Sequence, residues 1–296
     1  MNTTPEAVAV LGLGTMGLPM AINVRNAGIP TVVWNRTPLR DVVLDGLEAV
    51  PTAAEAVARA AVVVTMVSDA DAVLAIARDG GMLTVLAPGA AWVQMSTIGV
   101  AGTGRLIDLV AAERPDVVFV DAPVSGSEEP ARNGTLTILA SGPGEVRLRL
   151  EPLFSAVGQR TVWVGDAGAG SRMKLVVNTW LALATEAVAS SLSLAHRLGL
   201  ETGVVLETLD RSPLVSPWQA AKLRRIAEDD YSAQFALSLA LKDVRLALEA
   251  AGQDALPTLH ALSVQWQRAV EAGYGNQDLT AVLAALDARA QPRTSE

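Results

Sequence analysis

The sequence predicts an α/β fold with a mostly parallel sheet in its first half and an all-helical second half. Short β-branched runs alternate with helical patterns up to Val164, a glycine-rich turn joins the first run to the first helix, and only helical patterns follow Gly170. Such alternation is typical of parallel sheets covered by helices. Because the chain has 296 residues, half of them apolar, we expect two domains, residues 1–166 and 167–296.

Short runs rich in β-branched residues predict the strands of the first domain. These runs are Ala7–Leu11, Thr31–Trp34, Ala61–Val67, Ala91–Met95, Val117–Val120, Thr135–Ala140 and Thr161–Val164. Two threonines between the runs predict helix starts. Thr52 stands three residues before Glu55, which is the spacing of a capping box, and Thr97 precedes the helical pattern Val100–Ala112.

The second half begins with a long helical pattern from about Ser171 to Arg197, which Gly199 is placed to end. A helix of about 27 residues spans roughly 40 Å, so we expect it to leave the first domain and continue through the second as an interdomain helix. The later helical patterns cover Val204–Asp210, Trp218–Glu228, Leu237–Ala251, Pro257–Ala272 and Asp278–Ala288.

Charge and composition limit the classes of partner. The net charge of −8 has the wrong sign for binding phosphate backbones, so we expect no nucleic-acid partner. The chain has no cysteine, which excludes disulfides and thiolate metal sites and suits a reducing cytoplasm. Met1–Val10 do not resemble a targeting segment, and no uninterrupted apolar run has the length of a membrane span. We expect a soluble, cytoplasmic protein with no membrane partner and no metal.

The segment Gly12-Leu13-Gly14-Thr15-Met16-Gly17 follows the first predicted strand and opens the helical pattern Leu18–Asn26. In dinucleotide-binding units the first glycine permits a tight turn, the second lets backbone approach the pyrophosphate, and the third lets the helix pack on the strand. The N-terminus of the helix then faces the anion. The motif in this context predicts a Rossmann domain, and the alternative is a tight turn without a ligand.

The segment Asn35-Arg36-Thr37 favours NADP over NAD. It follows the second predicted strand, where NAD-binding versions carry an Asp or Glu for the ribose 2′-hydroxyl. Asn35 does not repel a 2′-phosphate, and the guanidinium of Arg36 offers a planar set of donors that can bind one. The alternative is that Arg36 is a solvated surface arginine.

Lys174 and Asn178 stand four residues apart in an otherwise nearly apolar stretch, Met173–Leu181. The spacing puts both side chains on one face of a helix, where an ammonium and an amide can jointly hold a polar substrate. Burial among apolar residues disfavours the charged form, so we expect the pKa of Lys174 to fall below about 10.4 and make it a better proton donor. The alternative is a lysine whose stem covers apolar surface and whose ammonium reaches water.

The motifs together resemble those of the β-hydroxyacid dehydrogenases, occur in that family's order and cover nearly the whole chain. They are Gly12–Gly17, Asp121–Ser127, Gly134–Thr137, Gly170 with Lys174 and Asn178, and Lys242-Asp243. Many members have glycine where this chain has Ser127, and Pro130 follows shortly after it. This departure looks most like the glyoxylate/succinic semialdehyde reductase branch.

The resemblance implies roles for individual residues. Lys174 matches the catalytic lysine and Asn178 its helix partner, and the loop of Ser125, Gly126 and Ser127 matches the one that binds the substrate carboxylate. To these we add Trp218, which follows Ser216-Pro217 in a loop expected to face the substrate. The predicted cofactor-binding residues are Gly12, Leu13, Gly14, Thr15, Met16, Gly17, Asn35, Arg36, Thr37, Met66, Val67, Thr97 and Lys242. Of these, Lys242 has the alternative of an exposed pair with Asp243 on an amphipathic helix.

The predicted function is NADP(H)-dependent interconversion of a small β- or γ-hydroxy acid and its semialdehyde, with Lys174 as general acid/base. The partners expected are a small carboxylate-bearing aldehyde or alcohol and further copies of the chain, in a homodimer or homotetramer. One alternative is an imine reductase or reductive aminase on the same fold, although such enzymes generally lack the lysine. Another is a non-catalytic NADP-binding scaffold, which predicts a damaged catalytic set.

Overall fold

The computed structural model describes residues 5–40, 44–209, 212–252 and 254–288. The chain divides into two compact units, Met1–Lys174 and Leu175–Glu296. Helix α9 (Ala169–Arg197) begins in the first unit and continues in the second. The domain boundary expected between residues 166 and 167 stays a prediction.

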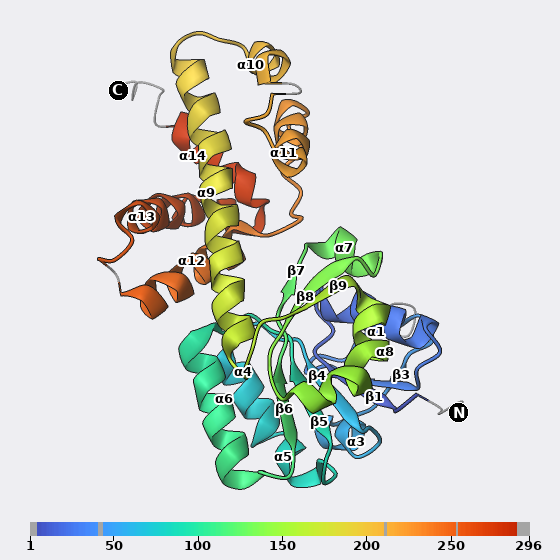
Figure 1. Cartoon of the computed structure of the whole chain (residues 1–296). Coiled ribbons are helices and arrows are strands. Elements are labelled where there is room, and N and C mark those ends of the chain that lie inside the picture. Colours follow the sequence, from blue (N-terminus) through green and yellow to red (C-terminus); the bar gives the residue numbers. More distant parts are fainter. Residues whose placement is uncertain (1–4, 41–43, 210–211, 253, 289–296) are drawn as a thin grey trace. The chain divides into compact units, whose positions relative to one another are not determined.

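A six-stranded parallel sheet forms the centre of the first unit, with the strand order β3-β2-β1-β4-β5-β6 (Figure 1). Its strands are β1 (Val8–Leu11), β2 (Thr31–Trp34), β3 (Glu48–Ala49), β4 (Val62–Thr65), β5 (Ala91–Gln94) and β6 (Val118–Asp121). Strand β1 pairs with β2 on one side and with β4 on the other. The chain therefore changes direction across the sheet at β1, which is the topological switch point of a Rossmann fold.

Helices cover both faces of this sheet. One apolar cluster joins it to α1 (Gly17–Asn26) and α8 (Arg147–Val157), and the other joins it to a second group of helices. The second group contains α3 (Ala53–Val57), α4 (Ala70–Ala77), α5 (Met82–Val85) and α6 (Gly99–Glu113). Along β1, Val8 and Val10 belong to the first cluster and Leu11 to the second, because side chains alternate across a strand.

The six-stranded sheet confirms the predicted mostly parallel sheet, and three further strands form a separate sheet. In it β7 (Val124–Ser125) pairs antiparallel with β8 (Leu136–Ala140), and β8 pairs parallel with β9 (Gly158–Trp163). Helix α7 (Glu128–Arg132) lies between β7 and β8. Both β3 and β7 escaped prediction, because two residues are too few to show an alternating pattern.

One of the two predicted helix starts is right and the other is wrong. The hydroxyl of Thr52 accepts a hydrogen bond from the Glu55 N–H at 3.1 Å and caps α3. Thr97 does not cap α6, which begins at Gly99 with Ile98 in the capping position. Gly99 has a φ of 77°, so a glycine turn brings the chain into this helix.

The second unit is helical throughout the residues that the structure describes. After α9 it contains α10 (Thr202–Leu209), α11 (Pro217–Ala227), α12 (Leu237–Ala251), α13 (Pro257–Glu271) and α14 (Val282–Asp287), with 3₁₀ turns η2 (Tyr274–Asn276) and η3 (Leu279–Ala281). Asp210, predicted to end α10, lies outside the described residues. The carboxylate of Glu186 on α9 accepts hydrogen bonds from Trp266 Nε1 at 3.0 Å and Gln265 Nε2 at 2.8 Å, which connects α9 to α13.

The end of α9 confirms the prediction made for Gly199. This glycine has a φ of 75°, and the Leu200 N–H donates to the Ala195 carbonyl at 2.9 Å, as in a Schellman motif. By length and composition alone, α9 is the one helix of the described residues that could cross a membrane, a property it shares with core helices of water-soluble proteins.

Trp218 lies in the first turn of α11, as the helical pattern Trp218–Glu228 predicted, and not in the loop that was expected to face the substrate. Ser216 and Gln219 form a capping box around this turn, and Pro217 occupies its first position. A proline at this position and a serine cap both favour a helix start, so the helix begins at Pro217, one residue before the predicted start at Trp218.

Candidate functional site

The predicted cofactor residues of the first unit follow the carboxyl ends of neighbouring parallel strands. The glycine turn follows β1, the Asn35 segment follows β2, Met66 and Val67 follow β4, and Thr97 lies three residues after β5. These strands are adjacent in the sheet, so the structure brings the four segments to one edge at the switch point. Open α/β sheets bind their ligands at this position.

The three glycines of the turn differ in whether neighbouring atoms leave room for a Cβ. A Cβ on Gly12 would lie 2.3 Å from the Met66 carbonyl oxygen, and a Cβ on Gly17 would lie 1.9 Å from the Gly12 carbonyl oxygen. Among the described residues, nothing lies within 4 Å of a Cβ on Gly14, which is exposed. Packing therefore explains Gly12 and Gly17, whereas bare backbone at Gly14 fits a pyrophosphate that approaches from outside.

The start of α1 also suits an anion. No side chain of the described residues caps this helix, and its capping position is occupied by Met16. The N–H groups of a first helical turn lack partners within the helix, and the helix dipole favours negative charge there. The turn and the helix start thus fit the phosphates of a dinucleotide.

Asn35 holds the glycine turn against the end of β2. Its Oδ1 accepts a hydrogen bond from the Leu13 N–H at 2.9 Å, and its Nδ2 donates to the Thr37 carbonyl at 2.7 Å. Arg36 and Thr37 are exposed beside it. Sequence reasoning missed Ser96, whose Oγ accepts a hydrogen bond from the Val67 N–H at 2.8 Å and so connects the segments after β4 and β5.

The Ser125–Ser127 loop is tightly constrained at its centre. Gly126 has a φ of 137°, and a Cβ there would lie 2.7 Å from Leu136 Cδ2 and 3.0 Å from Pro130 Cβ. Ser125 and Ser127 on either side are half-buried. The loop therefore has one backbone path, with two hydroxyls on it that can receive a carboxylate.

The first turn of α9 is bound to a buried carboxylate. Asp121 Oδ2 accepts a hydrogen bond from the Ser171 N–H at 2.7 Å, and Oδ1 accepts one from Ser171 Oγ at 2.8 Å. Ser141 Oγ donates to the Asp121 carbonyl at 3.0 Å and accepts from the Gly170 N–H at 2.9 Å. Lys174 follows Ser171 by about one turn and is 7% exposed. Asp121 thus fixes the turn that carries Lys174, although sequence reasoning gave it no role.

Asp121 leads to a prediction about pH. Burial raises the pKa of its carboxyl, opposed by the hydrogen bonds from Ser171 and Ser141. The folded state thus holds this proton more tightly than the unfolded state, so the stabilisation is complete below about pH 4 and is lost as pH rises through the folded pKa. Asp121→Asn removes this ionisation. We expect its urea midpoint, relative to the wild type, to improve as pH rises from about 4 to 8. A difference independent of pH would contradict this account.

In the second unit, Asn178 is buried and its amide is bound to α12. Asn178 Nδ2 donates to Asp243 Oδ2 at 2.5 Å, and Lys242 Nζ lies 3.3 Å from Asp243 Oδ1. Asp243 is 4% exposed, so Lys242-Asp243 is not a freely solvated pair. Asp243 was not among the predicted site residues, and its place beside Lys242 in the motif was the only signal for it.

Two family models cover this chain. One, described as the NAD-binding domain of 6-phosphogluconate dehydrogenase, matches residues 7–165. The other, described as NAD-binding of NADP-dependent 3-hydroxyisobutyrate dehydrogenase, matches residues 168–286. The chain belongs to the 3-hydroxyisobutyrate dehydrogenase family. As a member of this β-hydroxyacid dehydrogenase family it is an oxidoreductase with NAD(P)-binding domains, which confirms the resemblance seen in the motifs.

Relatives of this 3-hydroxyisobutyrate dehydrogenase family member are named for different substrates. Glyoxylate/succinic semialdehyde reductase 1 of Arabidopsis thaliana is 31% identical, over 94% of this chain and 98% of the relative. NAD-dependent L-serine dehydrogenase of Pseudomonas aeruginosa is 33% identical, over 95% of this chain and 98% of the relative. Mycobacterium tuberculosis 3-hydroxyisobutyrate dehydrogenase, solved with L-serine, is 26% identical with a TM-score of 0.84, over 95% of this chain and 99% of that one.

Imine reductases share the fold of the family. The enzyme from Myxococcus stipitatus, solved with NADP+, is 21% identical with a TM-score of 0.63, over 95% of this chain and 99% of that one. This likeness concerns the fold and carries no argument about the reaction.

Proposed function

We propose that this protein interconverts a small β- or γ-hydroxy acid and its semialdehyde with NADP(H), and that Lys174 is the general acid/base. The observation that carries the proposal is the buried residue Lys174, which lies on α9 just after the turn bound to Asp121 and is followed by the buried Asn178. A lysine buried in such a place is a candidate for a functional site. The semialdehyde is chosen because a relative that matches nearly the whole chain is named for reducing one.

Each residue has a part in the proposed reaction. Ser125 and Ser127 bind the substrate carboxylate through their hydroxyls and nearby N–H groups. When bound, the reduced nicotinamide supplies the hydride. The Lys174 ammonium stabilises the negative charge that develops on the carbonyl oxygen and donates a proton to it. In the oxidative direction, neutral Lys174 accepts the hydroxyl proton. Asn178, bound to Asp243, keeps the polar face of α9 in place.

The preference for NADP is part of the proposal and rests on Arg36. We expect Arg36→Asp to raise the Kd for NADPH about 10- to 100-fold, because a charge-assisted hydrogen bond to the 2′-phosphate contributes about 1.5–3 kcal/mol. The Kd for NADH should change much less. Titration of intrinsic fluorescence with each nucleotide measures both values.

Arg160→Asp is the matched control, since Arg160 is exposed on β9 and its replacement changes the net charge equally. Equal losses in the two variants would attribute the effect to overall charge. If Arg36→Asp lowered the affinity for NADPH and for NADH equally, Arg36 would not bind the 2′-phosphate.

A homodimer or homotetramer is also proposed, supported by an apolar stripe on α9. Val176, Trp180 and Leu183 are 63%, 80% and 38% exposed, and Leu194 and Leu198 continue the same face at 57% and 67%. Contiguous exposed apolar side chains mark interaction surfaces, and this spacing suits pairing with another helix. We expect Trp180→Glu to lower the mass measured by light scattering to that of the monomer, about 31 kDa. An unchanged mass would exclude this stripe as the interface.

A cytoplasmic location belongs to the same proposal.

The alternative of imine reduction is favoured by the shared fold alone. Lys174 supports carbonyl chemistry, because an ammonium can protonate a carbonyl oxygen directly. Assays with aldehyde alone and with aldehyde plus amine separate the two reactions. NADPH oxidation that requires the amine would favour an imine reductase. No NADPH oxidation under either condition would favour a nucleotide-binding scaffold.

A further inference from the structure

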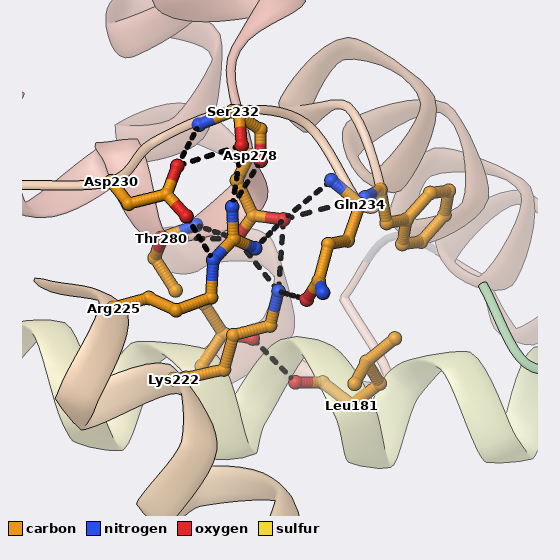
Figure 2. A network of polar contacts seen from close by, with 10 residues as sticks. Leu181, Lys222, Arg225, Asp230, Ser232, Gln234, Asp278 and Thr280 are labelled. Atoms are coloured by element: carbon orange, nitrogen blue, oxygen red, sulfur yellow. Dashed lines mark hydrogen bonds and ion pairs between the residues drawn. The ribbon is translucent and has the colours of Figure 1, made fainter. Parts of the chain in front are cut away.

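A buried ion pair joins α11 to η3 in the second unit. Lys222 Nζ lies 2.9 Å and 2.8 Å from the two carboxylate oxygens of Asp278, and the side chains are 5% and 0% exposed (Figure 2). Burying two charges costs several kcal/mol per ion even after relaxation, so such a pair is weak support for stability on its own. Burial also lowers the pKa of Lys222, partly offset by Asp278. The cost of the pair calls for a specific role.

The Asp278 carboxylate organises the segment that leads into α12. Its Oδ2 accepts hydrogen bonds from the Gln234 N–H at 3.1 Å and the Phe235 N–H at 3.3 Å. The Asp278 N–H donates to the Tyr231 carbonyl at 2.9 Å, and the Leu237 N–H donates to the Gln277 carbonyl at 2.9 Å. The backbone from residue 231 to the first residue of α12 is therefore held against Asp278 and its neighbour.

Lys222 extends this organisation to two further side chains. Its Nζ donates to Gln234 Oε1 at 3.0 Å and lies 5.8 Å from the centre of the Trp218 ring, one turn earlier on α11. Arg225 borders the same cluster, with Nη1 3.8 Å from Asp278 Oδ2 (Figure 2). Trp218 is a proposed substrate residue, so the ammonium contacts both that residue and the segment entering α12.

The helix that starts at this cluster carries the remaining proposed site residues of the unit. Lys242 and Asp243 lie within the first two turns of α12, and Asp243 accepts the hydrogen bond from Asn178. Because a helix is stiff over two turns, its starting point sets the positions of both side chains. The buried pair at the start of α12 is thus connected to Asn178 through α12 and Asp243.

We propose that Lys222 and Asp278 are positioning residues of the reductase, which hold Trp218 and the start of α12 so that Lys242, Asp243 and Asn178 adopt their working arrangement. This inference rests on the proposed function. A more exposed pair in the same unit, His196 and Asp287 at 33% and 31% exposure, serves for comparison. His196 Nδ1 lies 2.7 Å from Asp287 Oδ2 and His196 Nε2 lies 2.8 Å from Thr202 Oγ1, which joins α9, α10 and α14, and neither of these two contacts involves a proposed site residue.

The experiment compares Lys222→Met, Lys222→Arg, Asp278→Asn, the double variant Lys222→Met/Asp278→Asn and the control His196→Gln. Each protein is measured for kcat and KM with NADPH and succinic semialdehyde, and for backbone hydrogen exchange. We expect Lys222→Met and Asp278→Asn to lower kcat/KM about 10- to 100-fold, since small displacements of positioned groups have effects of this size. We also expect faster exchange in residues 231–243.

Recovery by related variants separates positioning from general stability. Lys222→Arg should keep more activity than Lys222→Met, because the charge opposite Asp278 is retained. The double variant should lose less than the product of the single losses, since no unpaired charge remains. His196→Gln should change neither kcat/KM nor exchange in residues 231–243.

Wild-type exchange in residues 231–243 of Lys222→Met would overturn the inference, as would equal losses in Lys222→Met and His196→Gln. Strictly multiplicative losses in the double variant would also overturn the role of the pair. If the wild-type protein failed to oxidise NADPH with every semialdehyde tested, the proposed function would be overturned instead. The exchange measurement would then still decide whether the pair orders this segment.

Discussion

Lys174→Ala is expected to lower kcat for semialdehyde reduction by about three orders of magnitude, with the fold intact. The loss combines the removal of a positioned proton donor with the removal of the charge that stabilises the developing oxyanion. Alanine is the best helix former, so α9 itself tolerates the change. Initial rates with saturating NADPH and semialdehyde measure the effect, and the Kd for NADPH should stay nearly unchanged.

Two comparisons make the Lys174 result specific. Met173→Ala is the matched control, because Met173 is the preceding residue of α9, is 38% exposed and has no proposed role. Added primary amine should restore part of the activity of Lys174→Ala, because it can occupy the vacated volume and donate a proton. Turnover of Lys174→Ala equal to that of the wild type would refute the assignment of general acid/base.

Gly17→Ala and Gly14→Ala are expected to fail in opposite ways, although each adds one methyl group. On Gly17 the new Cβ would lie 1.9 Å from the Gly12 carbonyl oxygen, so the turn or α1 must move. We expect a loss of about 2–4 kcal/mol in the free energy of unfolding, at the upper end for overpacking of a rigid site. On Gly14 the methyl meets no atom of the described residues within 4 Å, so stability should stay within about 0.5 kcal/mol.

For nucleotide binding, the informative substitution is Gly14→Ala. Gly14→Ala should bind NADPH at least about tenfold more weakly, because the methyl occupies the space through which backbone approaches the pyrophosphate. Urea unfolding and nucleotide titration of both variants measure the two effects. An unstable Gly14→Ala protein, or a stable one with wild-type affinity, would contradict the assignment of this turn to the dinucleotide.

Local sequence patterns predicted most of the fold, because the strands of the central sheet are continuous β-branched runs. Val62–Thr65 consists of β-branched residues and is fully buried, and Ala91–Gln94 is also fully buried although Val93 is its one β-branched residue. The two-residue strand Val124–Ser125 has no such pattern, and its pairing with β8 depends on residues more than ten positions away. Trp218 was predicted both to begin a helical pattern and to lie in a loop that faces the substrate, and the serine cap followed by proline that begins α11 decides for the helix.

The candidate site was predictable where its residues form a continuous motif, as in the glycine turn. It was not predictable where two residues distant in sequence meet. Asp121 and Ser171 are 50 residues apart, and Lys222 and Asp278 are 56 apart. Neither carboxylate has a distinctive local pattern, since its meaning comes from the hydrogen-bond donors that the fold delivers to it.

Isotope transfer from NADPH deuterated at the transferable position of the nicotinamide tests the central claim most directly. The wild-type protein is incubated with succinic semialdehyde and, separately, glyoxylate, without amine, and the product is analysed by mass spectrometry and NMR. We predict one deuterium on the carbinol carbon of the hydroxy acid, formed at a rate that Lys174→Ala reduces about a thousandfold. The proposal would be contradicted if neither aldehyde gave deuterated hydroxy acid, or if the wild type and Lys174→Ala formed it at equal rates.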